Sequence, residues 1–574
     1  MTAAQPPANR WLFGPVPDLL LGCGGAYALL VGVLLLAGPT LRESQPALLF
    51  PLIALLVGTP HYGATLVRVY EHRADRRRYA LFTVWATALI AAFFVAGIYV
   101  PAIGAFLVTL YLSWSPWHYT GQNYGIAVMF ARRNGVAISD ADKRWLYWSF
   151  LLSFLLALVV MHGAGDAGVG SNYVSPIHFV PIGIPASVLG VVVPVLGTAA
   201  AVALVTAAVR LLRLAPARAL LPVGLLMLTQ LLWFSLPFVL RYYEIHPRRL
   251  EPFDFDFRTY YFLWIAAGHQ IQYLWVTSWY ARQTGQWSGY APWYGKVLAA
   301  GGGVWMLPAL IFGPIGLGAL SMDQGLAILV AAAVNVHHFV LDGAIWKLRG
   351  RIAEILIRNA TETAEAPRAS WLGAGARRAV WAAGAFGIGL FAFHIVHQDL
   401  VRAAELRGDL AALRSTWQRL AWFGLDEAHG RLQLGRKLLA QGDLEGARAE
   451  FERSLALAPL PGAWDGLAET HARAGEWLLA AQACERGLER APDDLSLLGH
   501  GAIAWRLAGQ PERALPLIER ALSLDPGNAN LASEHRRVVA AVGSAGRART
   551  AGMQPAAGAL AGSGASEVRA ADSR

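Results

Sequence analysis

The sequence predicts an all-α protein in which a polytopic helical membrane domain of about eleven spans is followed by a soluble α-solenoid. Three observations support this fold class. The chain of 574 residues is 55% hydrophobic and only 15% charged, and it contains 21 tryptophans, a residue type enriched at membrane interfaces. Long apolar runs recur up to about residue 400. Beyond that point the sequence turns into soluble helices with a repeat of about 34 residues.

Each apolar run has about the 20 residues that a helix needs to cross a bilayer. No convincing cleavage pattern follows the first run, so we expect it to be an uncleaved helix. The predicted spans are 18–37, 47–70, 79–99, 103–131, 145–162, 184–212, 219–240, 259–281, 295–320, 324–347 and 378–398.

The orientation of the spans is predicted from the basic connections between them. The connections 71–78, 131–144, 210–218 and 347–378 are rich in arginine and lysine, which favours the cytoplasmic side. The connections 163–180 and 321–324 contain neither residue and fit the opposite side. We therefore expect a bacterial inner-membrane protein whose residues after 400 are periplasmic. Because the net charge of +10 resides mainly in these short loops, we expect no nucleic-acid partner.

The soluble part contains three similar segments, 428–461, 461–494 and 495–528, which resemble the tetratricopeptide repeat family. The matching positions are Leu434, Gly435, Leu438, Ala447, Phe451, Ser454, Pro459, Trp464, Leu467, Ala468, Ala480, Pro492, Leu498, Ala502, Trp505, Ala514, Ile518, Ala521 and Pro526. The resemblance implies two short helices per repeat and a concave surface that binds a protein partner. The predicted organisation is a membrane domain (1–400), a lead-in helix (401–427), the repeat domain (428–540) and a disordered tail (541–574).

Four of the predicted spans carry a histidine at a similar depth: His61, His118, His269 and His338. Each lies about 9 to 14 residues before the basic end of its span, at a rise of 1.5 Å per residue. Polar side chains cost several kcal/mol inside a membrane, so a histidine there is by default a functional-site hypothesis. We expect the four imidazoles to converge on one centre.

A metal ion would compensate for the burial of these groups, and neutral imidazole suits iron, copper or zinc. The candidate ligands are His61, His118, His269, His337, His338 and Asp342. His337 points about 100° away from His338, so only one of the pair faces the same centre as Asp342 unless the site is dinuclear. We expect a non-haem metal, with iron as the first choice. Haem ligation by opposed histidine pairs, a structural hydrogen-bond network and a proton path are the alternatives.

One helical turn after each histidine stands another polar residue: Thr65, Gln122, Tyr273 and Asp342. The spacing puts each on the face of its histidine, where it can fix the tautomer of an imidazole ring or, for Asp342, bind the metal directly. We assign Tyr273 and Gln122 as the candidate catalytic residues. Aromatic residues near the histidines are the expected walls of a substrate site: Trp114, Trp117, Tyr119, Trp264 and Trp275.

Two of the histidine segments are similar to motifs of the bacterial membrane β-carotene dioxygenases related to bacteriorhodopsin-associated protein. The segment GTPHYGATL around His61 resembles their Gly-x-Pro-His-Gly signature, and WHYTGQNYG around His118 resembles their Trp-His-Phe-Gly segment. The resemblance implies that both histidines bind a non-haem iron that cleaves a carotenoid with dioxygen. Tyr62 departs from the signature by interrupting its histidine-glycine step.

Together these patterns predict an integral-membrane, metal-dependent oxidoreductase or oxygenase that acts on an apolar, lipid-like small molecule and docks a protein on its repeats. The alternative is a non-enzymatic envelope scaffold or transporter in which the repeats assemble a complex and the histidines form a structural or proton-conducting network.

Overall fold

The computed structural model describes residues 10–33, 46–70, 79–163, 175–245, 264–284, 287–318, 320–348, 351–360 and 374–550. Within these ranges the chain is all-α, as predicted, and the one extended pairing is a parallel bridge between Gly163 and Ile184. The chain divides into two compact units. The membrane unit comprises Met1–Ile311 and Gly325–Asp399, and the repeat unit comprises Phe312–Gln324 and Leu400–Arg574.

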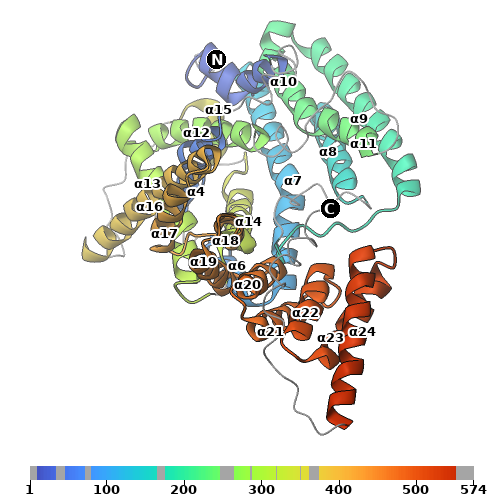
Figure 1. Cartoon of the computed structure of the whole chain (residues 1–574). Coiled ribbons are helices and arrows are strands. Elements are labelled where there is room, and N and C mark those ends of the chain that lie inside the picture. The colour runs from blue at the N-terminus through green and yellow to red at the C-terminus, as the bar shows by residue number, and fades with distance from the viewer. Residues whose placement is uncertain are drawn as a thin grey trace, which may run out of the picture. The chain divides into compact units, whose positions relative to one another are not determined.

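The membrane unit is built mainly from α-helices (Figure 1), several of which adjoin a π-helical segment, here written η. In chain order they are α1 (Pro15–Pro17), η1 (Asp18–Gly22), α3 (Leu49–Ile53), η2 (Ala54–Gly58), α4 (Thr59–Tyr70), η3 (Leu81–Ala86), α6 (Thr87–Tyr99), α7 (Pro101–Arg133), α8 (Asp140–Met161), α9 (Ala186–Leu214), α10 (Ala217–Gln230), η4 (Leu231–Ser235), α11 (Leu236–Ile245), α12 (Ile265–Gln283), α13 (Tyr290–Phe312), η6 (Met322–Leu326), α14 (Ala327–Ile345), α15 (Arg351–Arg358) and α16 (Ala374–Arg407).

Among the described residues, eight helices are long and apolar enough to cross a membrane, or nine if the bent first pair counts as one span. The predicted number of about eleven is therefore not reached. The two predicted spans that are not among these helices are α7 and α12. Both are long enough to cross a membrane, but their sequences are more polar than those of the other candidate spans. Their polarity comes largely from the segments around His118 and His269, where hydroxyl and carboxamide side chains accompany the histidine.

The first span is broken, with Pro15–Gly22 and Gly25–Val33 meeting at 65°. Before the break, the buried carboxylate of Asp18 holds the start of this span, because it accepts hydrogen bonds from the backbone N–H of Leu12 at 2.6 Å and from the indole of Trp275 at 2.9 Å. Gly24 has φ +79°, and a Cβ there would lie 2.4 Å from the hydroxyl of Thr229. Only glycine fits this turn.

α4 and α13 cross at very short range. A Cβ on Gly63 would lie 1.7 Å from the carbonyl oxygen of Val297, and one on Gly301 would lie 1.8 Å from that of Thr59. Small residues let membrane helices approach until their backbones touch. This contact fixes the position of α4, which carries His61.

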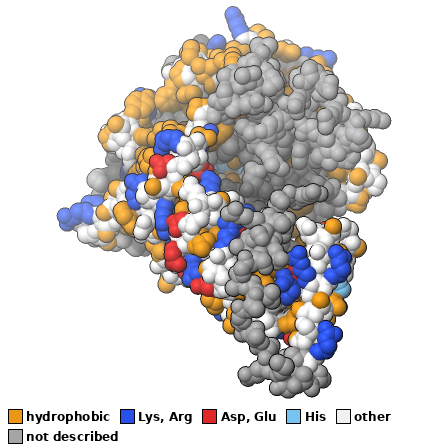
Figure 2. All heavy atoms as spheres, in the orientation of Figure 1, with side chains coloured by type: hydrophobic (Ala, Val, Ile, Leu, Met, Phe, Trp, Pro, Cys, Tyr) orange, Lys and Arg blue, Asp and Glu red, His pale blue; other side chains and the backbone are white. Residues whose placement is uncertain are grey.

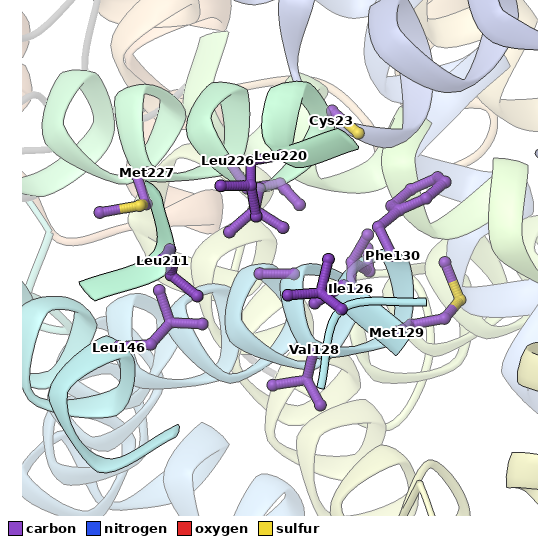
Figure 3. Packing of buried hydrophobic residues seen from close by; sticks show 14 of the residues in the cluster. Cys23, Ile126, Val128, Met129, Phe130, Leu146, Leu211, Leu220, Leu226 and Met227 are labelled. Atoms are coloured by element: carbon purple, nitrogen blue, oxygen red, sulfur yellow. The ribbon is translucent and has the colours of Figure 1, made fainter. Parts of the chain in front are cut away.

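One apolar cluster of this unit joins α7, α8, α9, α10 and α12. In Figure 3, Leu220 and Leu226 of α10 point toward Ile126 of α7. Packing of this kind holds α7, and hence His118, against the rest of the unit.

The repeat unit contains three consecutive helix pairs between a leading and a trailing helix. The helices are α17 (Leu410–Ala421), α18 (Ala428–Gln441), α19 (Leu444–Leu457), α20 (Pro461–Arg473), α21 (Trp477–Leu488), α22 (Leu495–Leu507), α23 (Pro511–Leu524) and α24 (Ala529–Thr550). Gly435 packs against the ring of Phe451, so small and large residues alternate where the helices cross, as the repeat pattern implies. The region is tetratricopeptide-like, and Figure 2 shows basic and acidic side chains interspersed over its helices.

Two boundaries differ from the predicted domain limits. The last membrane helix, α16, continues to Arg407, into the predicted lead-in segment. α24 continues to Thr550, past the predicted start of the tail at residue 541, and residues 551–574 lie outside the described part of the chain.

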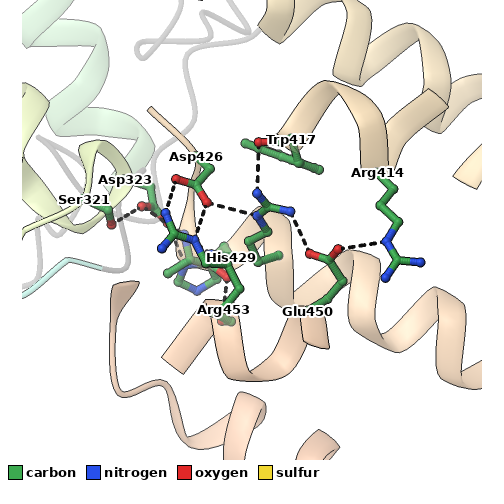
Figure 4. Close-up of polar contacts among 11 residues, drawn as sticks. Ser321, Asp323, Arg414, Trp417, Asp426, His429, Glu450 and Arg453 are labelled. Atoms are coloured by element: carbon green, nitrogen blue, oxygen red, sulfur yellow. Dashed lines mark hydrogen bonds and ion pairs between the residues drawn. The ribbon is translucent and has the colours of Figure 1, made fainter. Parts of the chain in front are cut away.

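The connection between α13 and α14 forms part of the repeat unit. Asp323 accepts hydrogen bonds from the backbone N–H groups of Ala428 at 3.3 Å and His429 at 3.2 Å, the first two residues of α18 (Figure 4). The N-cap residue Glu427 makes no side-chain cap of its own, so Asp323 satisfies this helix terminus from another segment. The ring of His429 also contacts this carboxylate, with 3.4 Å between Nδ1 and Oδ2.

A buried ionic network lies behind this cap. Asp426 has no exposed surface and binds the guanidinium groups of Arg431 and Arg453 at 2.8 to 3.1 Å (Figure 4). Arg431 also donates to Glu450 at 2.8 Å and to the carbonyl of Trp417 at 2.9 Å. The network joins α17, α18 and α19.

Candidate metal centre

The four membrane histidines converge in the structure from α4, α7, α12 and α14. Ligand atoms of His61, His269 and His338 lie within 4.8 Å of one another, and the same is true of His118, His338 and Asp342. His338 belongs to both groups. The two groups therefore form one cluster of five potential ligands around His338.

The closest contact within the cluster joins the Nε2 atoms of His61 and His338 at 2.9 Å. The Oδ2 atom of Asp342 lies 3.4 Å from Nε2 of His338 and 3.9 Å from Nε2 of His118. The rings of His118 and His269 meet edge to face, with their centroids 4.9 Å apart and an angle of 79° between their planes. Two nitrogens that bind one ion at about 2.0–2.1 Å stand roughly 2.9–3.4 Å apart, so the 2.9 Å separation of the His61–His338 pair already suits a shared ion.

The cluster is closed off from solvent and only partly hydrogen-bonded. His61, His269 and His338 are at most 2% exposed. Among the described residues no partner is found for Nδ1 of His61, Nε2 of His118 or either nitrogen of His269. A buried polar group without a hydrogen bond is costly and rare, so these four atoms leave binding capacity that a ligand could satisfy. Because all of them are imidazole nitrogens beside a carboxylate, the donor set fits a transition-metal ion.

Spacing along the helices produces a second polar layer one turn away. Thr65, Tyr273 and Asp342 each follow a site histidine by four residues, and all three side chains meet. The hydroxyl of Tyr273 donates to Oδ1 of Asp342 at 2.8 Å and lies 2.5 Å from Oγ1 of Thr65. Since both layers align, α4, α12 and α14 run in the same direction at the site, as their basic ends predict.

Gln122 lies at the edge of the cluster. It donates to the carboxamide of Gln272 at 2.5 Å and to the backbone carbonyl of His269 at 3.2 Å. Through Gln272 it joins a network of carboxamides that includes Asn123 and Gln230. Gln122 thus supports the α12 backbone at His269, whereas Tyr273 contacts the potential ligand Asp342 directly.

His337 is directed away from the other histidines. Its Nε2 atom lies 2.9 Å from the hydroxyl of Thr87 and 3.2 Å from that of Tyr70, and its ring stacks on Tyr70. The structure therefore does not bring His337 to the cluster, in line with its 100° offset from His338.

Of the five aromatic residues expected as substrate walls, only Tyr119 reaches a site histidine. Its ring stacks on His269 with a centroid distance of 4.1 Å. Trp114 packs on Phe339 and Trp117 on Phe154, while Trp264 packs on Phe50 and Trp275 binds Asp18.

Three residues near the site were not predicted. Phe339 stacks on His118 with a centroid distance of 4.4 Å, and the indole of Trp346 donates to the hydroxyl of Tyr273 at 3.2 Å. The buried guanidinium of Arg68 lies over the ring of Trp346 at 3.7 Å and donates to the carbonyl of Ile345. Arg68 and Trp346 lie one turn beyond the second polar layer, and that spacing is the signal that could have identified them.

Comparisons with known proteins add little to this picture. No family model matches the chain, and no curated protein matches it. Nine chains of solved structures match, among them the one described as "Crystal structure of MamA protein". That match has 14% identity and a TM-score of 0.25, and it covers 28% of this chain and 87% of the other. The β-carotene dioxygenase resemblance thus has no support from a family model.

Proposed function

We propose that this chain is an integral-membrane, metal-dependent oxidoreductase or oxygenase that acts on an apolar, lipid-like substrate. One observation carries the proposal: buried imidazoles of four helices converge beside a carboxylate, and three of these rings have nitrogens with no hydrogen-bond partner among the described residues. A structural network would use its hydrogen-bonding groups, because orphaned polar atoms destabilise a fold.

His61, His118, His269 and His338 would hold the metal, with Asp342 as a fifth ligand. A redox-active ion, with iron as first choice, would supply dioxygen binding and electron transfer at this position. The residues of the second layer act on protons: Tyr273 holds one proton against Oδ1 of Asp342 and so keeps that carboxylate in place. Tyr119 and Phe339 cover the histidines with apolar rings, which suits an apolar substrate and restricts water.

We also propose that the repeats lie on the non-cytoplasmic side and dock a protein there. The connection Phe312–Gln324 belongs to the repeat unit. In the described part of the chain, only the candidate spans at α14 and α16 separate it from the repeat helices, and two crossings return the chain to the same side. The connection 346–378 between these spans is rich in lysine and arginine, which favours the cytoplasm. This argument is independent of how many spans precede α13.

The alternative, a scaffold or transporter, draws on the broken first span. Broken spans lined by polar side chains are typical of transporter binding sites. Here, however, Gln272 donates to the carbonyl of Gly22 at 2.8 Å and Thr229 to that of Cys23 at 2.9 Å, so the break is satisfied internally.

The test is an elemental and optical analysis of detergent-purified protein, together with oxygen uptake in the presence of an apolar polyene. A His118→Ala/His338→Ala double variant serves as the control. We expect a bound non-haem metal and polyene-dependent oxygen uptake in the wild type, and neither in the variant. An intense Soret band would replace this proposal with haem ligation. Protein that binds neither metal nor haem, even after reconstitution, would refute the enzyme and leave the scaffold or transporter.

A further inference from the structure

We infer that Thr65 is a positioning residue that fixes the tautomer of His338 and thereby directs the Nε2 lone pair of this histidine into the cluster. The inference rests on the proposed function, because the lone pair matters only if the cluster binds a cation. It also gives the sequence expectation that these polar residues fix the tautomer of an imidazole ring a specific partner. Thr65 belongs to α4 and acts on α14.

Three groups lie within hydrogen-bond distance of the hydroxyl oxygen of Thr65. Nδ1 of His338 is at 2.9 Å, the hydroxyl of Tyr273 at 2.5 Å and Oδ1 of Asp342 at 3.2 Å. A hydroxyl has a single proton to donate and lone pairs that accept. Thr65 therefore cannot donate to all three groups, and it must accept a proton from at least one of them.

The neighbours decide how that proton is used. The indole N–H of Trp346 can only donate, and it donates to the oxygen of Tyr273. The proton of Tyr273 goes to Oδ1 of Asp342 at 2.8 Å. The proton of Thr65 is then directed at Tyr273 or Asp342, and its oxygen accepts from Nδ1 of His338.

The opposite arrangement would leave oxygen atoms in contact without a proton between them. If Thr65 donated to His338, it would have to accept the proton of Tyr273. The carboxylate of Asp342 would then face both hydroxyl oxygens at 2.8 and 3.2 Å with no hydrogen bond. Repulsion between these lone pairs disfavours that state, because a buried carboxylate needs donors.

With its proton on Nδ1, His338 presents a lone pair at Nε2, the atom that contacts both His61 and Asp342. Nε2 of His61 must then carry the proton in the 2.9 Å contact between the two rings. A cation entering the cluster would use the lone pair of His338 as it stands, whereas His61 would have to move its proton to Nδ1. His338 is thus the preorganised ligand, and His61 adapts.

The test is a Co²⁺ titration of the metal-free full-length protein in detergent, followed by the visible ligand-field bands of bound Co²⁺. Thr65→Val keeps the shape of the side chain and removes the hydroxyl, and Thr65→Ser retains it. Thr277→Val is the matched control, because Thr277 is buried in α12 and donates only to backbone carbonyls, those of Tyr273 and Leu274. We expect Thr65→Val to bind Co²⁺ about 10- to 100-fold more weakly with altered bands, and Thr65→Ser and Thr277→Val to resemble the wild type.

A second variant separates the tautomer from general packing. In Tyr273→Phe the proton of Thr65 can still be donated to Asp342, so His338 keeps its tautomer and we expect the Co²⁺ affinity to fall by less than in Thr65→Val. If Tyr273→Phe lost as much Co²⁺ affinity as His338→Ala, the inference would be overturned, and this result does not depend on whether Thr65→Val folds. Equal affinity of Thr65→Val and wild type would overturn the inference alone. Failure of the wild type to bind Co²⁺ would overturn the proposed function as well.

Discussion

The contact between α4 and α13 is a direct way to test how the fold holds the candidate metal centre. Gly63→Ala would place a methyl group 1.7 Å from the carbonyl oxygen of Val297, where contacts under 3.0 Å are essentially never seen. The helices must then separate by at least roughly 1.3 Å, and overpacking of this kind costs about 1–3 kcal/mol. His61 and Thr65 lie two residues before and after Gly63, and each contacts His338 at 2.9 Å. A displacement of α4 by this amount is larger than the range of about 0.5 Å over which such contacts remain hydrogen bonds.

We expect Gly63→Ala to lower the melting temperature of the detergent-solubilised protein and to weaken Co²⁺ binding by at least about 10-fold. Gly343→Ala is the matched control, since it lies beside Asp342 and a methyl group there meets nothing within 4 Å. The Co²⁺ affinity of Gly343→Ala should equal that of the wild type, and its helix should be more stable by up to about 1 kcal/mol because alanine is a better helix former than glycine. A Gly63→Ala protein with the melting temperature and Co²⁺ affinity of the wild type would refute the reasoning.

Two further predictions concern the repeat unit. Asp426→Ala removes the carboxylate that lies 3.1 Å from the buried Arg431, so we expect the free energy of unfolding to fall by about 3–5 kcal/mol. Amide hydrogen exchange in α18 and α19 should become faster while the metal content stays unchanged. Unchanged exchange would contradict this prediction. The hydrogen bond with Asp323 raises the pKa of His429 above its ordinary value of 6.5. The stabilisation is therefore fully present below pH 6.5 and is lost as the pH rises through the raised pKa. Amide hydrogen exchange of α18, corrected for its intrinsic pH dependence, should become faster across that pH range in the wild type but not in His429→Gln. An identical pH dependence in both proteins would contradict this prediction.

The sequence predicted much of the cluster because helical geometry relates spacing to direction. Histidines at one depth were expected to converge, and His61, His118, His269 and His338 do. The four-residue spacing also linked His338, rather than His337, to Asp342. Their service as metal ligands stays a prediction.

Features that depend on how helices cross were beyond sequence analysis. Spacing places Gln122 on the face of His118, but the crossing of α7 and α12 directs it to Gln272 instead. The same polar residues explain why two spans predicted from the sequence are too polar to count as apolar helices. Tyr119 and Phe339 stack on histidines of other helices, and the packing of Thr65 against His338 likewise joins residues far apart in the chain.

The most direct test of the central claim is the number of metal ions per chain in purified wild type, His338→Ala and His337→Ala, measured by elemental mass spectrometry. The two substitutions remove neighbouring histidines from one helix, but only His338 lies in the cluster. We predict a stoichiometric metal in the wild type and in His337→Ala, and its loss in His338→Ala. Equal metal content in all three proteins, or none in the wild type, would contradict the account.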